Sequence, residues 1–198
     1  SAAGWENRTL EVIIPADPGN HGAEKGWHSA AFDDRTWETM PLPGAWQQHG
    51  HNYSAVMWFR TRVTLPPPLR GKALALHLGA VDKHDITYVN GVEVGRTGSG
   101  FDESVWAQPR EYAIPAQLTR GAELVIAVRA YSFRYGGGLI GPAAAMRLVA
   151  AEDPEGTSIP LAGDWRYQVE HNFGLIAMGE SMGHGQANSP YMLFENMI

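Results

Sequence analysis

The sequence predicts an all-β protein, an antiparallel β-sandwich or jelly roll. A series of short runs alternates apolar with polar residues, and turn signals separate the runs. Between two such runs stand Asn90 and Gly91, the pair that best tolerates the positive φ angles of a two-residue type I′ hairpin turn. No segment has a convincing helical period. Short strands, frequent turns and no helices together are typical of a sandwich.

Composition excludes several classes of partner. The chain has 198 residues and a formal net charge of −6, whereas nucleic-acid binding requires clustered Lys and Arg, so we expect no nucleic-acid partner. No apolar run approaches the roughly 18 residues that span a bilayer, so we expect no membrane partner. The lack of cysteine removes disulfides and thiolate chemistry without placing the protein in a compartment.

The first 31 residues are predicted to be a lead-in of one strand and a loop. The strand-like run at residues 10–14 stops at a proline, and a stretch rich in Pro, Gly and Asp follows. Residues 32–46 also contain prolines, which forbid a long helix. We therefore expect this segment to be irregular, with Trp37 and Trp46 anchoring it onto a sheet.

Clear strands are predicted from residue 57 onward. Residues 57–65 alternate and end at three prolines, and residues 73–78 have one strongly apolar face. Residues 124–128 are apolar on both faces, which is typical of a central strand. Further strands are expected at residues 110–114, 146–149 and 165–169, and a single helical turn at residues 115–120.

The hairpin between residues 84 and 95 has a predicted register. Its two-residue loop places Val89 opposite Val92, Tyr88 opposite Glu93 and Thr87 opposite Val94. Since side chains alternate between the faces of a sheet, we expect the valine-bearing face to join a core and the Tyr88 face to meet solvent.

The order of these segments resembles a known family. The similar blocks are FDDRTWETMPLPGAW, MWFRTRVTL, GKALALHLGAVDKHDITYVNGVEVGRT, REYAIPAQL, LVIAVRAY, GGGLIGP and IPLAGDWRYQVE. They are similar to the galactose-binding-like jelly-roll domain carried inside sialate O-acetylesterase-type proteins. A related domain stands at the front of family 2 glycoside hydrolases such as β-galactosidases. The resemblance covers residues 32–169, and residues 78–95 are its most telling part.

The resemblance implies three segments. Residues 1–31 form the lead-in, residues 32–172 the β-sandwich domain, and residues 173–198 a linker that returns toward a missing catalytic domain. Residues 189–198 are similar to the segment by which the family's chain rejoins its hydrolase domain. The parent protein would then be a hydrolase acting on extracellular glycans, which favours an extracellular or periplasmic location.

This fragment is not expected to be an enzyme, and no catalytic residue is assigned. A serine hydrolase needs a serine within reach of a histidine and usually an acid, and the family's nucleophile block and late Asp and His have no counterpart here. Ser181 superficially resembles a second block of such esterases but lacks its preceding Trp and Gln. His49 and His51 are too few for a metal site, so no metal is assigned.

A ligand site is expected in the loops at one end of the sandwich. Aromatic rings there could stack on a sugar, or they could be ordinary core residues. These rings belong to Trp46, Tyr53, Phe101, Trp106, Phe133 and Tyr135. The predicted ligand-binding residues are Trp106, Arg110, Tyr135, Gly137, Asp82 and Asp85. Among them Trp106 is the ring most expected to be displayed, because it lies in the loop between the hairpin and the next strand.

Asp82 and Asp85 have two possible roles at the strand end. Their carboxylates could hold a structural calcium ion, or they could accept hydrogen bonds from backbone amides and close the turn. The resembling family usually has two adjacent acids where this chain has Asp82 and Lys83, so a function tied to the second acid is not carried over.

Three classes of function follow. The leading one is a non-catalytic carbohydrate-binding-like accessory domain of a carbohydrate-active esterase, with the N-terminal sugar-binding domain of a β-galactosidase-like glycosidase as an alternative setting. The second class is a purely structural domain that packs on the parent's catalytic domain. The third class is a complete small hydrolase. The expected partners are accordingly a glycan or the parent's catalytic domain.

Overall fold

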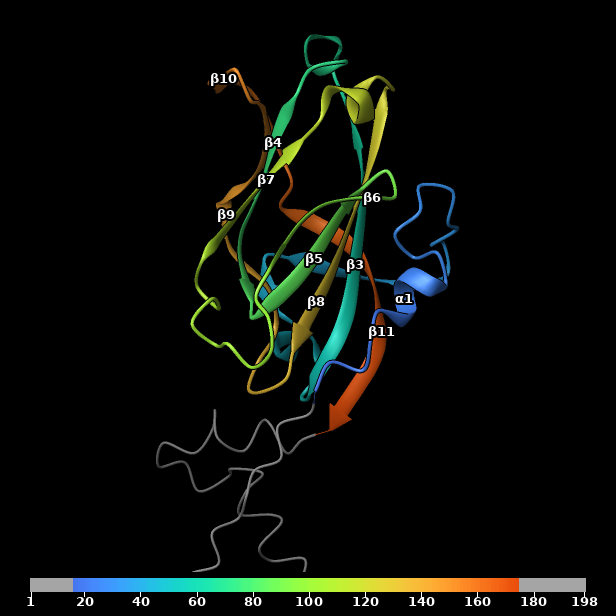
Figure 1. The fold of residues 1–198 in the computed structure, drawn as a ribbon, viewed down its shortest axis with the longest axis vertical. Helices are drawn as coiled ribbons and strands as arrows, with labels where there is room; N and C mark the ends of the chain where they lie inside the picture. The colour runs from blue at the N-terminus through green and yellow to red at the C-terminus, as the bar shows by residue number, and fades with distance from the viewer. Residues whose placement is uncertain (1–15, 175–198) are drawn as a thin grey trace, which may run out of the picture.

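Two antiparallel sheets packed face to face make up this computed structural model, which describes residues 16–174 (Figure 1). The all-β sandwich expected from the alternating runs is therefore confirmed. Among the described residues the α-helical content is one short turn, α1 (His21–Glu24), and no helix there is long and apolar enough to cross a membrane.

The larger sheet has six strands in the order β1-β11-β3-β8-β5-β6. Their bounds are β1 (Glu38–Leu42), β11 (Gly163–Gly174), β3 (Ser54–Thr64), β8 (Glu123–Ser132), β5 (His84–Val89) and β6 (Val92–Thr97). Strand β8 lies between β3 and β5 and is buried on both faces, as its doubly apolar sequence predicts.

The smaller sheet has the order β10-β9-β4-β7, with β2 paired to β9. Its strands are β10 (Asp153–Pro160), β9 (Gly138–Ala150), β4 (Leu74–Asp82), β7 (Pro109–Ile114) and β2 (Gly44–Ala45). The 3₁₀ turns are η1 (Trp46–His49), η2 (Pro67–Leu69) and η3 (Ala116–Thr119). The last of these confirms the helical turn predicted after residue 115.

The main core lies between the two sheets. It is built from the inward-facing alternate residues of each strand, such as Leu74, Leu76 and Leu78 on β4, all fully buried. Trp46 is also fully buried in this core, and Trp37 is buried on the opposite side of the large sheet. Both tryptophans therefore anchor the segment before β3, as expected.

The hairpin joining β5 to β6 turns at Asn90 and Gly91, whose φ angles are 50° and 84°. These values confirm the predicted turn, and Val89 pairs with Val92 and Tyr88 with Glu93. The pairing of Thr87 with Val94 is wrong. A register shift between Thr87 and Tyr88 places Gly95 opposite Thr87, because Val94 is the extra residue of a β-bulge.

The outer face of the six-stranded sheet is covered by residues 16–37, so the prediction that Tyr88 meets solvent is wrong. Tyr88 stacks on Trp58 at 5.7 Å between ring centroids, and Trp27 packs edge-on against Trp58. Asn20, the N-cap of α1, donates to the Tyr88 hydroxyl at 2.7 Å. The described part of the lead-in thus forms a second apolar cluster with the sheet.

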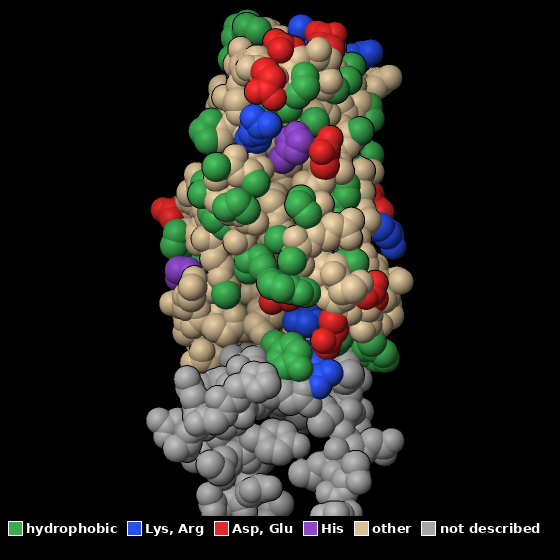
Figure 2. Space-filling view, turned by 90° about the vertical axis from the view of Figure 1, so that its left-hand side faces the viewer, with side chains coloured by type: hydrophobic (Ala, Val, Ile, Leu, Met, Phe, Trp, Pro, Cys, Tyr) green, Lys and Arg blue, Asp and Glu red, His purple; other side chains and the backbone are tan. Residues whose placement is uncertain are grey.

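Within residues 16–174, no segment covers the opposite face of the sandwich, the outer face of the smaller sheet. Figure 2 shows this outer face of the five-stranded sheet, where small apolar side chains are interspersed with charged ones. Ala75, Ala113 and His77 lie on it, and His77 is 3.6 Å from the Glu111 carboxylate on β7.

Two further expectations need comment. The segment at residues 32–46 is not wholly irregular, because β1 pairs with β11; Pro41 is tolerated there since β1 is an edge strand. The strand-like run at residues 10–14 and the segment at residues 175–198, with Ser181, lie outside the described residues.

Candidate functional site

Five side chains from three segments line a pocket at the end of the sandwich where both described chain ends lie. This end pocket holds about 260 Å³ and is formed by Asp82, Lys83, Glu103, Trp106 and Tyr135. The Trp106 side chain is 53% exposed, among the most exposed large apolar residues of the described chain. The expectation of an exposed ring at Trp106 is confirmed, and Tyr135 lines the same pocket as predicted. Asp82, also among the predicted ligand-binding residues, lines it too.

A short turn positions the Trp106 ring. The Asp102 carboxylate accepts hydrogen bonds from the backbone N–H and the hydroxyl of Ser104, at 2.8 and 2.6 Å. The N–H of Trp106 then donates to the carbonyl of Glu103 at 3.1 Å. Glu103 and Trp106 are thus held on one turn, and both face the pocket.

Arg110 fastens this turn to the sandwich from beneath. Its guanidinium is buried and donates to the carbonyls of Val105 and Gln108 in the Trp106 loop, at 2.7 and 2.5 Å. It also donates to the carbonyls of Val81 and Lys83 and to Asp85. Arg110 is therefore a neighbour of Trp106, as predicted, but its donors are occupied by the protein, so its role in the site is to position the loop.

Asp85 is likewise buried, in a network of side chains. Its carboxylate accepts from Arg110 at 2.8 Å, Thr87 at 2.8 Å and Tyr112 at 2.9 Å. Burial raises the pKa of Tyr112, and the Asp85 charge raises it further, so the phenol stays a proton donor. The prediction of backbone-amide bonding is wrong for Asp85, because its partners lie on β5 and β7.

Lys83 points inward behind the pocket. Its ammonium donates to the Asp82 carboxylate at 3.1 Å, the Ser132 hydroxyl at 3.2 Å, and the carbonyls of Arg134 and Gly136. The predicted backbone contact of Asp82 is therefore replaced by a side-chain ion pair. Burial raises the pKa of Asp82, and the nearby Lys83 charge opposes that shift. Lys83 supplies the positive charge beside Asp82 and holds the loop that follows β8.

That loop places Tyr135 at the pocket in an unusual backbone conformation. Tyr135 has φ of 63°, in the left-handed region that bulky residues rarely occupy. The Ser54 hydroxyl donates to its carbonyl at 3.1 Å, and the guanidinium of Arg134 lies 4.9 Å from its ring. Such conformations persist only where the surroundings enforce them, and they cluster at functional sites.

Gly137 has a packing role. A Cβ atom there would come within 2.1 Å of the Trp46 ring, and its carbonyl accepts from the Trp46 N–H at 3.0 Å. The glycine therefore allows close approach to a buried tryptophan, and it does not line the end pocket. Two other loop aromatics differ in exposure: Phe133 is fully buried, whereas Phe101 is 51% exposed.

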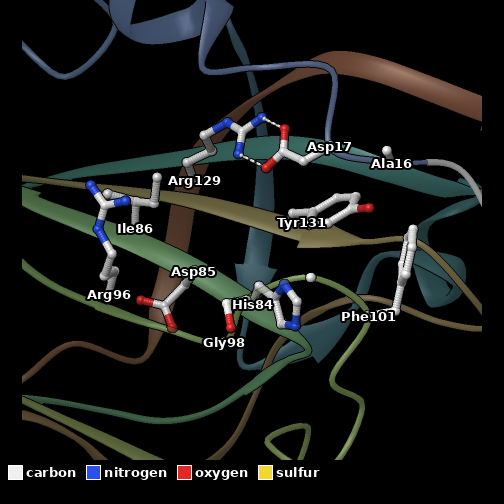
Figure 3. A pocket seen from close by; sticks show the side chains of 12 residues that line it. Ala16, Asp17, His84, Asp85, Ile86, Arg96, Gly98, Phe101, Arg129 and Tyr131 are labelled. Carbon is white, nitrogen blue, oxygen red and sulfur yellow. Dashed lines mark hydrogen bonds and ion pairs between the residues drawn. The ribbon is translucent and has the colours of Figure 1, made fainter.

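A second hollow, the side groove, lies on the outer face of the six-stranded sheet between the β6 exit and the first described residues (Figure 3). It holds about 390 Å³, and Asp17, His84, Phe101, Arg129 and Tyr131 line it with others. Arg129 donates two parallel hydrogen bonds to the Asp17 carboxylate, each 2.7 Å long (Figure 3). The His84 Nε2 donates to the Asp102 carbonyl at 2.8 Å. The charged groups here fasten segments of the chain together.

The described residues contain no group of three or more His, Asp or Glu side chains that could hold a metal ion. The His51 ring bonds the hydroxyls of Tyr53 and Tyr167, at 2.6 and 2.9 Å. Burial lowers the pKa of His51.

The sequence does not single out Lys83 or Glu103 for the site. Glu103 carries one signal, because it stands three residues before Trp106 in a stretch rich in turn formers. Lys83 carries none, since apart from the adjacent Asp82 its partners lie 49 to 53 residues further along the chain.

The chain was compared with known proteins, and no family model matches it. One curated protein, a β-glucuronidase from Paenibacillus borealis, is 29% identical over 91 residues, which is 43% of this chain and 15% of that protein. This chain is similar to part of a β-glucuronidase. It therefore spans less than a fifth of the length of that relative.

Solved structures give the same class of neighbour. A Ruminococcus gnavus β-glucuronidase is 22% identical with a TM-score of 0.46, covering 56% of this chain and 18% of the other. A Bacteroides uniformis β-glucuronidase is 20% identical with a TM-score of 0.45, covering 71% and 15%. Both neighbours are β-glucuronidases.

Proposed function

We propose that this chain is a non-catalytic sugar-binding domain of a larger carbohydrate-active hydrolase, of the kind found in family 2 glycoside hydrolases. The observation that carries the proposal is the end pocket, where a displayed indole stands beside two carboxylates. A flat aromatic ring stacks on the apolar face of a pyranose, and carboxylates accept hydrogen bonds from its hydroxyls. The left-handed Tyr135 at the same pocket supports a functional role.

The parent hydrolase is proposed to be a glycosidase. The order of sequence motifs resembles sialate O-acetylesterase-type proteins, and that parent remains the alternative. The similarity to a β-glucuronidase over 91 residues favours the glycosidase. The catalytic residues of either parent would lie in another domain.

A purely structural domain that packs on the catalytic domain is the second candidate. The half-exposed rings of Phe101 and Trp106 favour it, because exposed apolar side chains also mark protein interfaces. Sugar binding by the isolated chain separates the two candidates.

The test is calorimetric titration of the chain with methyl galactosides and glucosides and with sialosides. We expect binding in the millimolar range or tighter, and Trp106→Ala should weaken it by about 1–2 kcal/mol, the worth of an aromatic contact beyond area burial. Phe101→Ala is the matched control, since Phe101 is equally exposed but lines the side groove. If no sugar binds at millimolar concentration, the structural candidate replaces the proposal.

A further inference from the structure

We infer that the end pocket selects neutral pyranosides and rejects sugars that carry a carboxylate, such as uronates and sialates. The inference rests on the proposed sugar-binding function and concerns the charges around the same pocket. Its basis is that the carboxylates at the pocket face the ligand, while the neighbouring cations are occupied by the protein.

The anionic groups are Asp82 and Glu103. Both line the pocket, and the Glu103 side chain is partly exposed. An ionised carboxylate can accept hydrogen bonds but cannot donate them, so it suits the hydroxyl donors of a neutral sugar. A carboxylate on the ligand would instead meet the like charge of Glu103, whose nearest arginine nitrogen is 3.5 Å away and belongs to a residue outside the pocket lining.

Lys83 compensates the charge of Asp82 but is not available to bind a ligand carboxylate directly. An ammonium has three protons to donate. The Lys83 ammonium already has four acceptors within hydrogen-bond distance: Asp82, Ser132 and the carbonyls of Arg134 and Gly136. Its side chain is also almost wholly buried, so a ligand carboxylate would have to displace a protein acceptor to reach it.

The two neighbouring arginines are similarly engaged. Arg134 Nη1 lies 3.5 Å from the Glu103 carboxylate, and its guanidinium stacks over Tyr135. Arg110 donates hydrogen bonds to Asp85 and to four backbone carbonyls. Neither arginine lines the pocket. Within residues 16–174, the cations beside the pocket therefore neutralise the protein's own groups.

The test uses two ligands that differ only at C6. Methyl β-D-glucopyranoside carries a hydroxymethyl group there, and methyl β-D-glucuronide carries a carboxylate. We expect the glucuronide to bind the chain about five- to tenfold more weakly at neutral pH and low salt, the effect of one like-charge pair at about 4 Å in water. Added salt should narrow the difference, because it screens exposed charges.

Glu103→Gln should raise the ratio of glucuronide affinity to glucoside affinity severalfold, because it removes the like charge that only the glucuronide meets. The glucoside affinity itself should fall, since a neutral amide oxygen is a weaker acceptor than a carboxylate. Glu111→Gln is the matched control: it changes the net charge equally, but Glu111 lies on the open face of the small sheet, outside the pocket. It should leave both affinities unchanged.

The outcomes separate the two proposals. If the glucuronide binds as tightly as the glucoside, or more tightly, the charge selection is overturned while sugar binding stands. If Glu111→Gln acts as strongly as Glu103→Gln, the selection comes from net charge and not from the pocket, and the inference also fails. If neither ligand binds, the sugar-binding function itself is overturned, and the selection with it.

Discussion

The side groove and the end pocket contain the same kinds of side chain, but the fold uses them in opposite ways. In the groove, Arg129 is surrounded by the carboxylates of Asp17 and Glu170, and every one of these groups serves to fasten the lead-in to the sheet. In the end pocket, Glu103 and Trp106 are held in place yet remain exposed. The contrast shows that the charges of the side groove are paired within the protein, whereas the end pocket keeps an exposed indole and a partly exposed carboxylate, the groups on which the proposed sugar binding rests.

The physical reason lies in where the two hollows occur. A segment that crosses a sheet face must satisfy the polar groups that it buries, so its charges pair with those of the sheet. A loop at a strand end can be held through its backbone, as the Trp106 loop is where its carbonyls accept hydrogen bonds from the Arg110 side chain. The side chains of such a loop are then left for solvent or ligand.

Removing the ion pairs of Arg129 in the side groove should have the largest effect on the free energy of unfolding. Arg129→Leu should lower the free energy of unfolding by about 3–5 kcal/mol, because it leaves the buried Glu170 carboxylate without its cation. Urea unfolding followed by circular dichroism measures the change. Any sugar affinity of the protein that remains folded should be unaltered, because Arg129 lies outside the end pocket.

The matched control for this variant is Arg62→Leu. Arg62 pairs with Glu123 at 3.1 Å on the surface, and both side chains are exposed. Its removal should cost only about 0–1 kcal/mol. Equal losses in the two variants would contradict the view that the ion pairs of the side groove fasten the lead-in to the sheet.

The Asn90 and Gly91 turn offers a reference remote from both hollows, since it stands at the far end of β5 from His84. Gly91→Val should lower the free energy of unfolding by about 1–3 kcal/mol, because a β-branched side chain is strained at φ of 84°. Thermal unfolding reports the loss, with Val92→Thr at the exposed next position as control. An unchanged melting temperature would show that the turn does not require glycine.

The smallest effect on the free energy of unfolding is expected from lowering the pH, which protonates Asp17. Burial acts to raise the pKa of Asp17, but the hydrogen bonds and charge of Arg129 outweigh it, and the pKa lies below its ordinary value of 3.8. A lowered pKa contributes stability that is present above pH 3.8 and is lost as pH falls through the folded value. Because Asp17 is partly exposed, solvent screening keeps the loss modest.

Asp17→Asn tests this dependence. The difference in unfolding free energy between the wild type and this variant should be constant above about pH 5 and shrink below pH 3.8. Urea unfolding at several pH values gives that difference. A difference that grows as the pH falls would contradict the pairing of Asp17 with Arg129.

Much of the sandwich could be predicted from local sequence. The period of two at residues 73–78 predicts burial on one face, as the structure has it. On β3 the alternation fails to predict that Trp58 and Arg60 are buried too, because the lead-in covers that face of the sheet. Asn90 and Gly91 predict their turn because few other pairs adopt its φ angles. The displayed Trp106 could be predicted too, because a ring in a polar loop between two strands has little apolar surface to cover it.

Other features were decided only by the tertiary structure. Tyr88 is buried because a segment more than 60 residues earlier covers its face of the sheet. Asp85 and Arg110, 25 residues apart, became an internal ion pair, and Lys83 was turned inward by a loop about 50 residues away. The local sequence pattern indicates which face of its strand a residue occupies and which residues can form a turn. Which charges are paired, and which remain for a ligand, depends on distant segments that the fold brings together.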